Sequence, residues 1–405
     1  MSAAPNPVRL VVTDDLRRSR LTVFFRLFLA IPHYLWAVLI GTAVFVCVFA
    51  NWFVLLVRAR TPEGLHGFIA GYLRYLARLE AYFLLAADPF PGFYLLGEKP
   101  YPVDLEIDPP ARQSRWKTVF RLFLAIPAFA ISASLLWGGP RSNSYFSGGV
   151  ACAAAFLLWF LGVFRARASR GLRDVIAYSI GYASQLSAYV FLITDRYPYS
   201  GPNAFAQPRE ANELHPVRMS VADDLRRSRL LVFFRLPIAV PHILWWLLWT
   251  VLSLAVSLLN WICALAIGRP PQPFHRFLSA WVRYSTHLFA FVFLVGNPFP
   301  GFVGKPGTYP VDLDLPAAEP QRRLVTLFRL PLAIPALIIS GGLDGALFAA
   351  GILGWFAALF TGRMPDGMRN LGAYALRYSG QANAYLYLLT ERYPDSGPRP
   401  DPASP

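Results

Sequence analysis

Four arginines recur at matching positions in the chain and are the residues best suited to bind an anion. Each stands in the phrase Phe-Arg-Leu-x-x-Ala-x-Pro, at Arg26, Arg121, Arg235 and Arg329. A guanidinium group grips a phosphate through two parallel hydrogen bonds, so these arginines are candidate contacts for anionic lipid head groups. The alternative is a topology anchor, in which the long side chain reaches from an apolar segment toward the head groups.

Uncharged polar residues also recur, inside or beside the apolar segments. The matched pairs are His33 and His242, His66 and His275, and Asn51 and Asn260. Two histidines could bind a metal or respond to pH, but no H-x-x-x-H motif or carboxylate cluster joins these. An asparagine in an apolar helix lines a cavity or bonds to a neighbouring helix. We therefore interpret His33, His242, Asn51 and Asn260 as candidate intramembrane polar contacts.

No arrangement of residues indicates catalysis. Cys47, Cys152 and Cys263 lie far apart without a C-x-x-C pair, which predicts free thiols rather than a disulfide or a zinc site. P-loop, dinucleotide and metalloprotease motifs are absent from the sequence. Ser179 has a glycine two residues later, but its segment has the pattern of a helix rather than a nucleophile elbow. We expect no cofactor, no metal and no enzymatic activity.

The elements that carry these residues form a repeat of about a hundred residues. Each copy has an extended segment, the Phe-Arg-Leu phrase, and a long apolar stretch that ends in Trp and, eight residues later, Arg. The predicted divisions are module 1 (1–98), module 2 (99–200), a polar linker (201–213), module 3 (214–305), module 4 (306–398) and a disordered tail (399–405).

The short segments around each apolar stretch have their own patterns. The extended segments alternate, as in Val103–Ile107, and predict short strands that could pair into one small cytoplasmic sheet. After the apolar stretch, Thr61-Pro62-Glu63 marks a helix start. The predicted helix has an apolar face and a polar face, which suits a helix lying in the membrane interface. The equivalent helices should begin near residues 171, 272 and 365.

The composition indicates lipid as the solvent. Hydrophobic residues make up 55% of the 405 residues and charged residues only 15%, with a mean hydropathy of +0.41. Soluble domains carry about a quarter charged residues. The net charge is +15, and the basic residues lie beside the apolar stretches. This placement favours an anionic membrane surface over nucleic acid as the partner. The N-terminus shows no signal peptide.

The length of the apolar stretches raises the question of one crossing or two. Residues 27–57 carry no charge, which is long for one span of about 20 residues and short for two. Module 2 carries a polar insertion around residues 138–144, and module 4 has glycines at 341–345, both typical of a turn. Because both flanks of every stretch are basic, hairpins with both flanks in the cytoplasm fit best. The alternative is a single span, residues 33–57 in module 1.

The predicted fold is therefore a mainly α-helical integral membrane protein. Each of its four modules would hold a transmembrane helical hairpin, an interfacial amphipathic helix and a short β segment. We expect a multi-pass protein of the plasma membrane with both termini in the cytoplasm.

Several phrases resemble a known bacterial family, catalogued as domain of unknown function 4389. They are the Phe-Arg-Leu-x-x-Ala-x-Pro run, the Tyr-Pro-Val-Asp-Leu segments of modules 2 and 4, residues 360–365 and residues 384–390. The resemblance covers nearly the whole chain as two tandem units. It implies a membrane protein and supplies no activity.

The function predicted from these observations is a non-enzymatic module that organises a membrane assembly or binds lipid. Its partners would be the bilayer, anionic head groups, and a membrane protein or a second copy of the chain. One alternative is a transporter or channel for an uncharged solute, because the apolar stretches hold almost no ionisable residues. Another is a membrane enzyme acting on lipids.

Overall fold

The computed structural model describes residues 6–95, 100–138, 148–202 and 215–398. These residues form two compact units, the first from residues 6–138 and 148–200 and the second from residues 201–202 and 215–398, so each unit combines two of the predicted modules. The predicted linker, from residue 203, and the predicted disordered tail lie outside the described residues.

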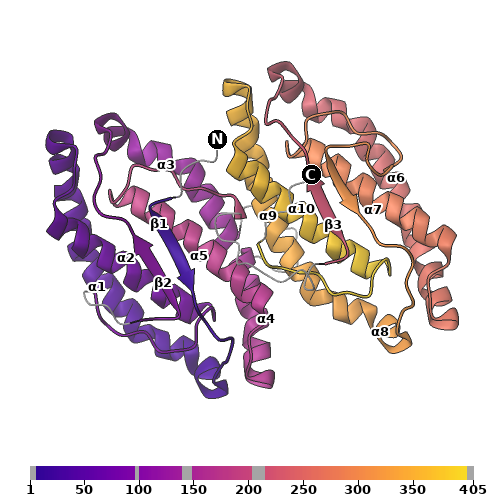
Figure 1. The fold of residues 1–405 in the computed structure, drawn as a ribbon, viewed down its shortest axis with the longest axis horizontal. Coiled ribbons are helices and arrows are strands. Elements are labelled where there is room, and N and C mark those ends of the chain that lie inside the picture. Colours follow the sequence, from indigo (N-terminus) through magenta and orange to yellow (C-terminus); the bar gives the residue numbers. More distant parts are fainter. Residues whose placement is uncertain (1–5, 96–99, 139–147, 203–214, 399–405) are drawn as a thin grey trace. The chain divides into compact units, whose positions relative to one another are not determined.

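The two units have closely similar element orders (Figure 1). Unit 1 contains β1 (Val8–Val12), α1 (Arg20–Arg58), α2 (Glu63–Phe83), β2 (Val103–Ile107), α3 (Arg115–Leu136), α4 (Val150–Arg165) and α5 (Arg170–Val190). Unit 2 contains β3 (Arg218–Val221), α6 (Arg229–Ile267), α7 (Gln272–Val292), β4 (Val311–Asp314), α8 (Arg323–Leu327), α9 (Arg329–Thr361) and α10 (Asp366–Leu386). We call α1, α3, α4, α6 and α9 the outer helices and α2, α5, α7 and α10 the chord helices.

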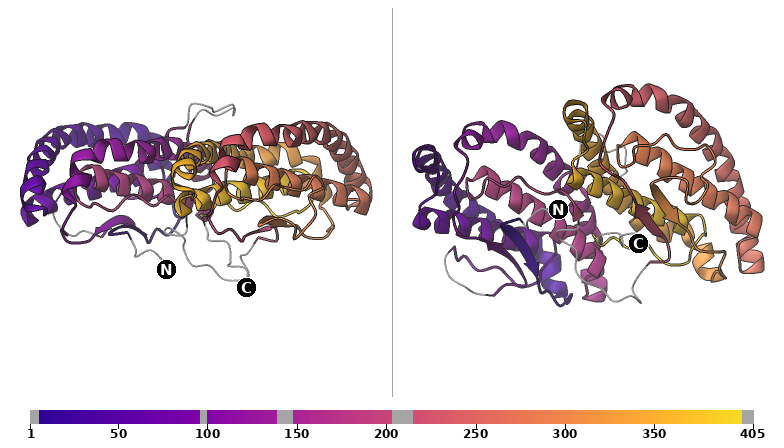
Figure 2. Two further views of the ribbon diagram at one scale, coloured as in Figure 1. Left: turned by 90° about the horizontal axis from the view of Figure 1, so that it is seen from above. Right: turned by 45° about the horizontal axis from the view of Figure 1, so that its top comes forward.

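The outer helix α1 is bent, because a much shorter chord helix joins its two ends. α2 starts five residues after α1 ends, and its last turn reaches back to Arg26, which donates to the Tyr82 carbonyl. From Arg26 to Arg58 a helix rises about 50 Å, whereas the 21 residues of α2 cover about 30 Å. α1 must therefore curve, and Figure 2 shows both α1 and α6 as arcs. Pro32, inside α1, removes one helical hydrogen bond and favours such a bend.

The predicted helical hairpin is wrong for modules 1, 3 and 4, because α1, α6 and α9 run without a break. The glycines at 341–345 belong to α9 instead of forming a turn. A continuous helix pairs its backbone N–H groups with its own carbonyl groups. A long apolar sequence therefore favours an unbroken helix where water is absent. Two further glycines, Gly351 and Gly354, let α9 approach its neighbours, since an added Cβ would lie 2.5 Å from Phe293 and from Met364, respectively. In module 2 the chain does divide, into α3 and α4, and residues 139–147 between them lie outside the described part.

Each unit has three layers, which Figure 2 shows edge-on. The outer helices lie on one side, the chord helices in the middle and the strands on the opposite side. The predicted helix starts are confirmed at Glu63, Arg170, Gln272 and Asp366. Nearly all of α5 is buried inside unit 1, and the position of the chord helices at the membrane interface stays a prediction.

The polar stripe of the chord helix meets the strands instead of water. In unit 1, Arg78 of α2 pairs with Asp104 of β2 at 2.6 Å, and Arg74 donates to the Leu105 carbonyl at 3.1 Å. In unit 2, Asp312 of β4 accepts from His287 of α7 at 2.8 Å. The aspartate of Tyr-Pro-Val-Asp-Leu thus ties each second strand to the chord helix of the preceding module.

The strands form two small sheets rather than the single sheet of four that the sequence suggested. β1 pairs with β2 and β3 with β4, both antiparallel, with Leu10 opposite Leu105 and Met219 opposite Leu313. Each sheet joins the two modules of one unit.

The outer helices expose apolar side chains along their length. On α1 the buried stripe contains small residues such as Ala30 and Ala37, whereas Phe28, Val38 and Phe45 are each about 70% exposed. Four described helices are long and apolar enough to cross a membrane, namely α1, α3, α6 and α9.

Candidate functional site

The candidate site is a polar seam between the outer and chord helices, and the repeated arginines begin it. Arg26 is 2% exposed and lies over the ring of Tyr82 at 4.4 Å. It donates to the carbonyls of Tyr82 and Ala87 and pairs with Asp88 at 2.8 Å. The Tyr82 carbonyl belongs to the last turn of α2, and the Ala87 carbonyl belongs to the segment that follows this helix. Arg26 therefore caps the chord helix with a charged donor.

The other three repeated arginines make equivalent contacts. Arg121 donates to the Tyr189 carbonyl at 2.7 Å, Arg235 to the Phe291 carbonyl at 2.7 Å and Arg329 to the Thr390 carbonyl at 3.4 Å. All three are 1–2% exposed and lie over an aromatic ring. Each fixes the start of an outer helix to the end of its chord helix. Binding of a lipid head group by these arginines stays a prediction, and it would have to compete with these protein acceptors.

His33 and His242 occupy matching places farther along the seam. Both are 0% exposed, and each bonds through Nδ1 to a tyrosine of the chord helix, at 2.9 Å to Tyr75 and 2.8 Å to Tyr284. The ring of His33 stacks on Phe93 at 4.2 Å, and the ring of His242 stacks on Phe302 at 4.0 Å. The two histidines thus form polar contacts between an outer helix and its chord helix, and their position inside a membrane stays a prediction.

Asn51 and Asn260 lie near the far ends of α1 and α6. Asn51 donates to the Thr61 hydroxyl at 3.2 Å, and Thr61 donates to the Leu192 carbonyl at the end of α5. Asn260 donates directly to the Tyr387 carbonyl at the end of α10. The asparagines thus connect one module of a unit to the other.

The repeated tryptophans, two of which directly follow these asparagines, make a second connection between modules. Trp52 donates from Nε1 to the Thr118 carbonyl at 3.2 Å, Trp261 to Thr326 at 2.7 Å and Trp355 to Val232 at 2.8 Å. Each acceptor lies in the first turns of the outer segment of the neighbouring module. The two outer segments of a unit are therefore joined to each other by hydrogen bonds.

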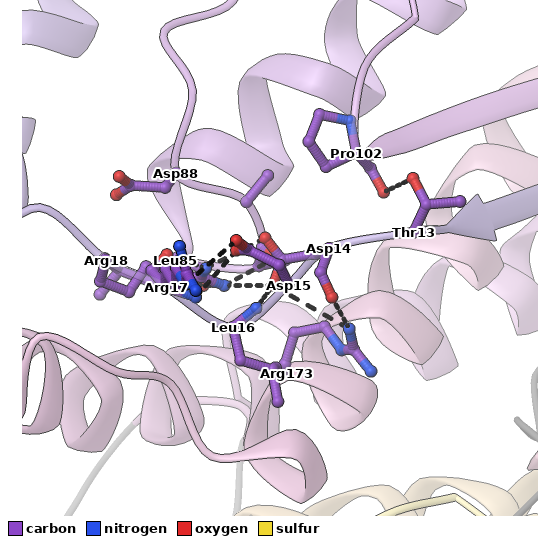
Figure 3. Close-up of polar contacts among 12 residues, drawn as sticks. Thr13, Asp14, Asp15, Leu16, Arg17, Arg18, Leu85, Asp88, Pro102 and Arg173 are labelled. Atoms are coloured by element: carbon purple, nitrogen blue, oxygen red, sulfur yellow. Dashed lines mark hydrogen bonds and ion pairs between the residues drawn. The ribbon is translucent and has the colours of Figure 1, made fainter.

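A buried ion pair was not anticipated from the sequence (Figure 3). Arg18 pairs with Asp14 at 2.8 Å, and their side chains are 1% and 2% exposed. Arg18 also donates to the Leu85 carbonyl at 3.1 Å, while Arg173 of α5 donates to the Asp14 carbonyl at 3.0 Å. The signal was present, because Asp-Asp-Leu-Arg-Arg-Ser-Arg recurs in module 3, where Asp223 and Arg227 form the same pair at 2.7 Å.

The polar side chains of the seam hold the elements of each unit together. Its carboxylates are paired with arginines, and a buried pair is costly to break because one charge would be left alone. Among the described residues, no three His, Cys, Asp or Glu side chains are grouped so that they could hold a metal ion. Apart from the Arg18–Asp14 pair and its counterpart in module 3, every contact described above joins two different elements of the fold, each of which is an outer helix, a chord helix or a connecting segment.

Comparison with known proteins gives a family and no activity. No curated protein and no solved structure matches the chain. A family model, described as Domain of unknown function (DUF4389), matches residues 20–94, 229–303 and 323–396. Each matched segment contains one outer helix and its chord helix, so the family unit is a single module rather than the pair that the resemblance suggested. Because the three matches cover more than half of the sequence, the chain belongs to the DUF4389 family.

Proposed function

We propose that this chain is an integral membrane protein that acts as a non-enzymatic, lipid-interacting module. Its bent outer helices enter the plasma membrane from the cytoplasmic side and return to that side. Both termini stay in the cytoplasm. The chord helices and strands form a platform beneath them.

One observation carries this proposal: α1 and α6 have their polar residues inside and their apolar residues outside. On α1, the buried face holds Arg26, His33 and Asn51, while the face away from α2 exposes Phe28 and Phe45. Exposed apolar patches larger than a few hundred Å² are rare on soluble monomers. Hydrocarbon is the solvent that such a surface fits.

The bend supports the same-side arrangement. A chord helix of about 30 Å joins the two ends of α1, so both ends lie at the level of the platform. Arginines flank both ends, including Arg17, Arg20, Arg58 and Arg60. Basic residues are enriched on the cytoplasmic flanks of membrane segments, and an arch places both flanks there.

The lipid-interacting role follows from what the exposed surface contains. The apolar arcs provide area for acyl chains, and the basic flanks provide charge for anionic head groups. The polar groups of the seam are engaged with one another, which supports a structural role for them.

Membrane insertion can be tested by flotation. The purified chain should float with neutral phosphatidylcholine vesicles and stay with them at alkaline pH, because apolar burial and not charge holds it. Val38→Asp with Phe45→Asp should reduce flotation severely, whereas Val11→Asp, on strand β1, should leave it unchanged. A wild-type chain that stays monodisperse without detergent and sediments apart from vesicles contradicts the proposal.

The same-side arrangement has its own test by cysteine labelling. In a chain whose three native cysteines are replaced by alanine, Ser19→Cys and Arg60→Cys place one thiol before and one after α1. An impermeant maleimide should label both in inverted membrane vesicles and neither in intact cells. Labelling of one thiol from each side means that α1 crosses the membrane once.

A further inference from the structure

A groove on the strand side of α7 is lined by basic and unpaired polar side chains. It has a volume of about 620 Å³ and is formed by the first turns of α7 and the segments before and after β4. The polar and charged residues that line it are His275, Arg276, Ser279, Arg283 and Lys305. None of the residues that line it is acidic.

Two buried polar atoms in this lining have no hydrogen-bond partner among the described residues. They are Nε2 of His275 and Oγ of Ser279, in side chains that are 5% and 8% exposed. A buried polar atom without a partner costs about 1–3 kcal/mol, so such atoms are normally satisfied by a ligand or by water. A hydroxyl can donate to an anion, and an imidazole can accept from a ligand hydroxyl or donate once protonated.

The cations of the groove have free capacity. Arg276 and Lys305 are exposed, and their side chains form no hydrogen bond or ion pair with another described residue. Arg283 donates to the carbonyls of Leu313 and Gly304 and lies 3.5 Å from Asp312, which leaves its NH2 nitrogen available. The positive end of the α7 dipole adds to the charge at these first turns.

We propose that this groove binds a phosphate-bearing anion. Arg276 and Arg283 would contact the phosphate oxygens as planar donors, Lys305 as a point charge and Ser279 as a hydroxyl donor. The phosphate could belong to a lipid head group or to a soluble compound. The proposal is independent of membrane insertion, because phosphate binding can be measured in detergent whether or not the chain enters a bilayer.

Unit 1 offers a matched control inside the same chain. At the positions of His275 and Arg283 it keeps His66 and Arg74, but Gly67 stands in place of Arg276 and Ala70 in place of Ser279. The double variant Arg276→Gly with Ser279→Ala therefore gives unit 2 the side chains that unit 1 already tolerates on its chord helix. Lys305→Ala is a second variant, at an exposed position outside any helix.

The test is calorimetric titration of the full chain in detergent with inorganic phosphate at constant ionic strength. The wild type should bind saturably, and the double variant and Lys305→Ala should each bind at least about tenfold more weakly, the effect expected when one charge-assisted contact is lost. Arg226→Gln removes an exposed charge outside the groove and should change the affinity by less than about twofold. Absence of saturable binding, or equal binding by the double variant and the wild type, overturns the proposal.

The source of the phosphate is decided by repeating the titration in nanodiscs. If discs that contain phosphatidic acid abolish phosphate binding that discs of phosphatidylcholine permit, the groove takes a lipid head group. If both discs permit the same binding, the groove takes a soluble phosphate. In both outcomes the groove variants must lose phosphate binding. If the variants keep wild-type binding in both kinds of disc, the proposed site is contradicted.

Discussion

His33 and Tyr75 form two hydrogen bonds with each other, one between side chains and one back to the main chain. Nδ1 of His33 lies 2.9 Å from the Tyr75 hydroxyl oxygen, and that hydroxyl donates to the His33 carbonyl at 3.1 Å. Because the hydroxyl has a single proton, Nδ1 must carry a hydrogen and donate. His242 and Tyr284 repeat the arrangement in unit 2 at 2.8 and 3.2 Å. The pair fixes the outer helix to its chord helix just after the repeated proline.

Loss of this tyrosine hydroxyl should destabilise the fold. Tyr75→Phe leaves a buried N–H and a buried carbonyl without their partner, at a cost of about 1–3 kcal/mol. Thermal unfolding of the detergent-solubilised chain should show a lower Tm. Tyr34→Phe, at a tyrosine of α1 that is 39% exposed, is the control and should leave the Tm nearly unchanged. Equal Tm values for the two variants would contradict the role of the hydrogen bonds.

Removal of the Arg26 guanidinium should have a larger effect. Arg26→Gln leaves Asp88 and the carbonyls at the end of α2 without their charged donor, and breaking a buried pair costs about 3–5 kcal/mol. Arg26→Lys should also be destabilised, because an ammonium group lacks the planar fork that reaches several acceptors. Arg58→Gln, at an exposed position, should shift the free energy of unfolding by no more than about 0.5 kcal/mol. Denaturant unfolding in detergent measures all three, and a tolerant Arg26→Gln would refute the capping role.

Two glycines should respond in opposite directions to alanine. A Cβ at Gly41 would lie 2.6 Å from the Tyr72 hydroxyl oxygen, which donates to the Ala37 carbonyl, so Gly41→Ala should destabilise by about 1–3 kcal/mol. A Cβ at Gly67 would meet nothing within 4 Å, so Gly67→Ala should stabilise α2 by up to about 1 kcal/mol. A Tm that rises for both variants would show that α1 does not approach Tyr72 this closely.

Stability should depend on pH through Glu80 of α2. Burial raises the pKa of Glu80 from 4.5 to about 7 in the folded chain. The folded state therefore holds this proton more tightly than the unfolded state. Its contribution to stability is fully present below pH 4.5 and is lost as the pH rises through 7. Tm measured from pH 5 to pH 8 should fall more steeply for the wild type than for Glu80→Gln, and identical slopes would exclude this contribution.

The repeat could be predicted from the sequence, since residue types recur at fixed offsets. The start of α2 at Glu63 followed from a Thr-Pro-Glu signal. The shape of α1 could not be predicted from the sequence, because a run of apolar residues is equally compatible with a hairpin, a straight span or an arc. The chord helix selects the arc through contacts such as Arg26 to Tyr82, which are distant in sequence.

The partners of the candidate residues were partly predictable. A histidine and an asparagine in an apolar helix must find polar partners, and His33 and Asn51 do. The arginines were expected at a lipid surface because their positions near helix starts fit an anchor. They are buried because the end of each chord helix supplies carbonyl acceptors, which sequence spacing does not reveal.

The central claim is that the exposed face of α1 lies in hydrocarbon. A spin label at Phe45, which is 73% exposed near the middle of α1, tests it most directly in phosphatidylcholine vesicles when compared with a label at Val11 of β1. Oxygen concentrates in the bilayer, whereas a nickel chelate stays in water. At Phe45 we expect the spin label to relax faster with oxygen than with nickel, and at Val11 the reverse. Higher nickel access at Phe45, or low access to both reagents there, would contradict the account.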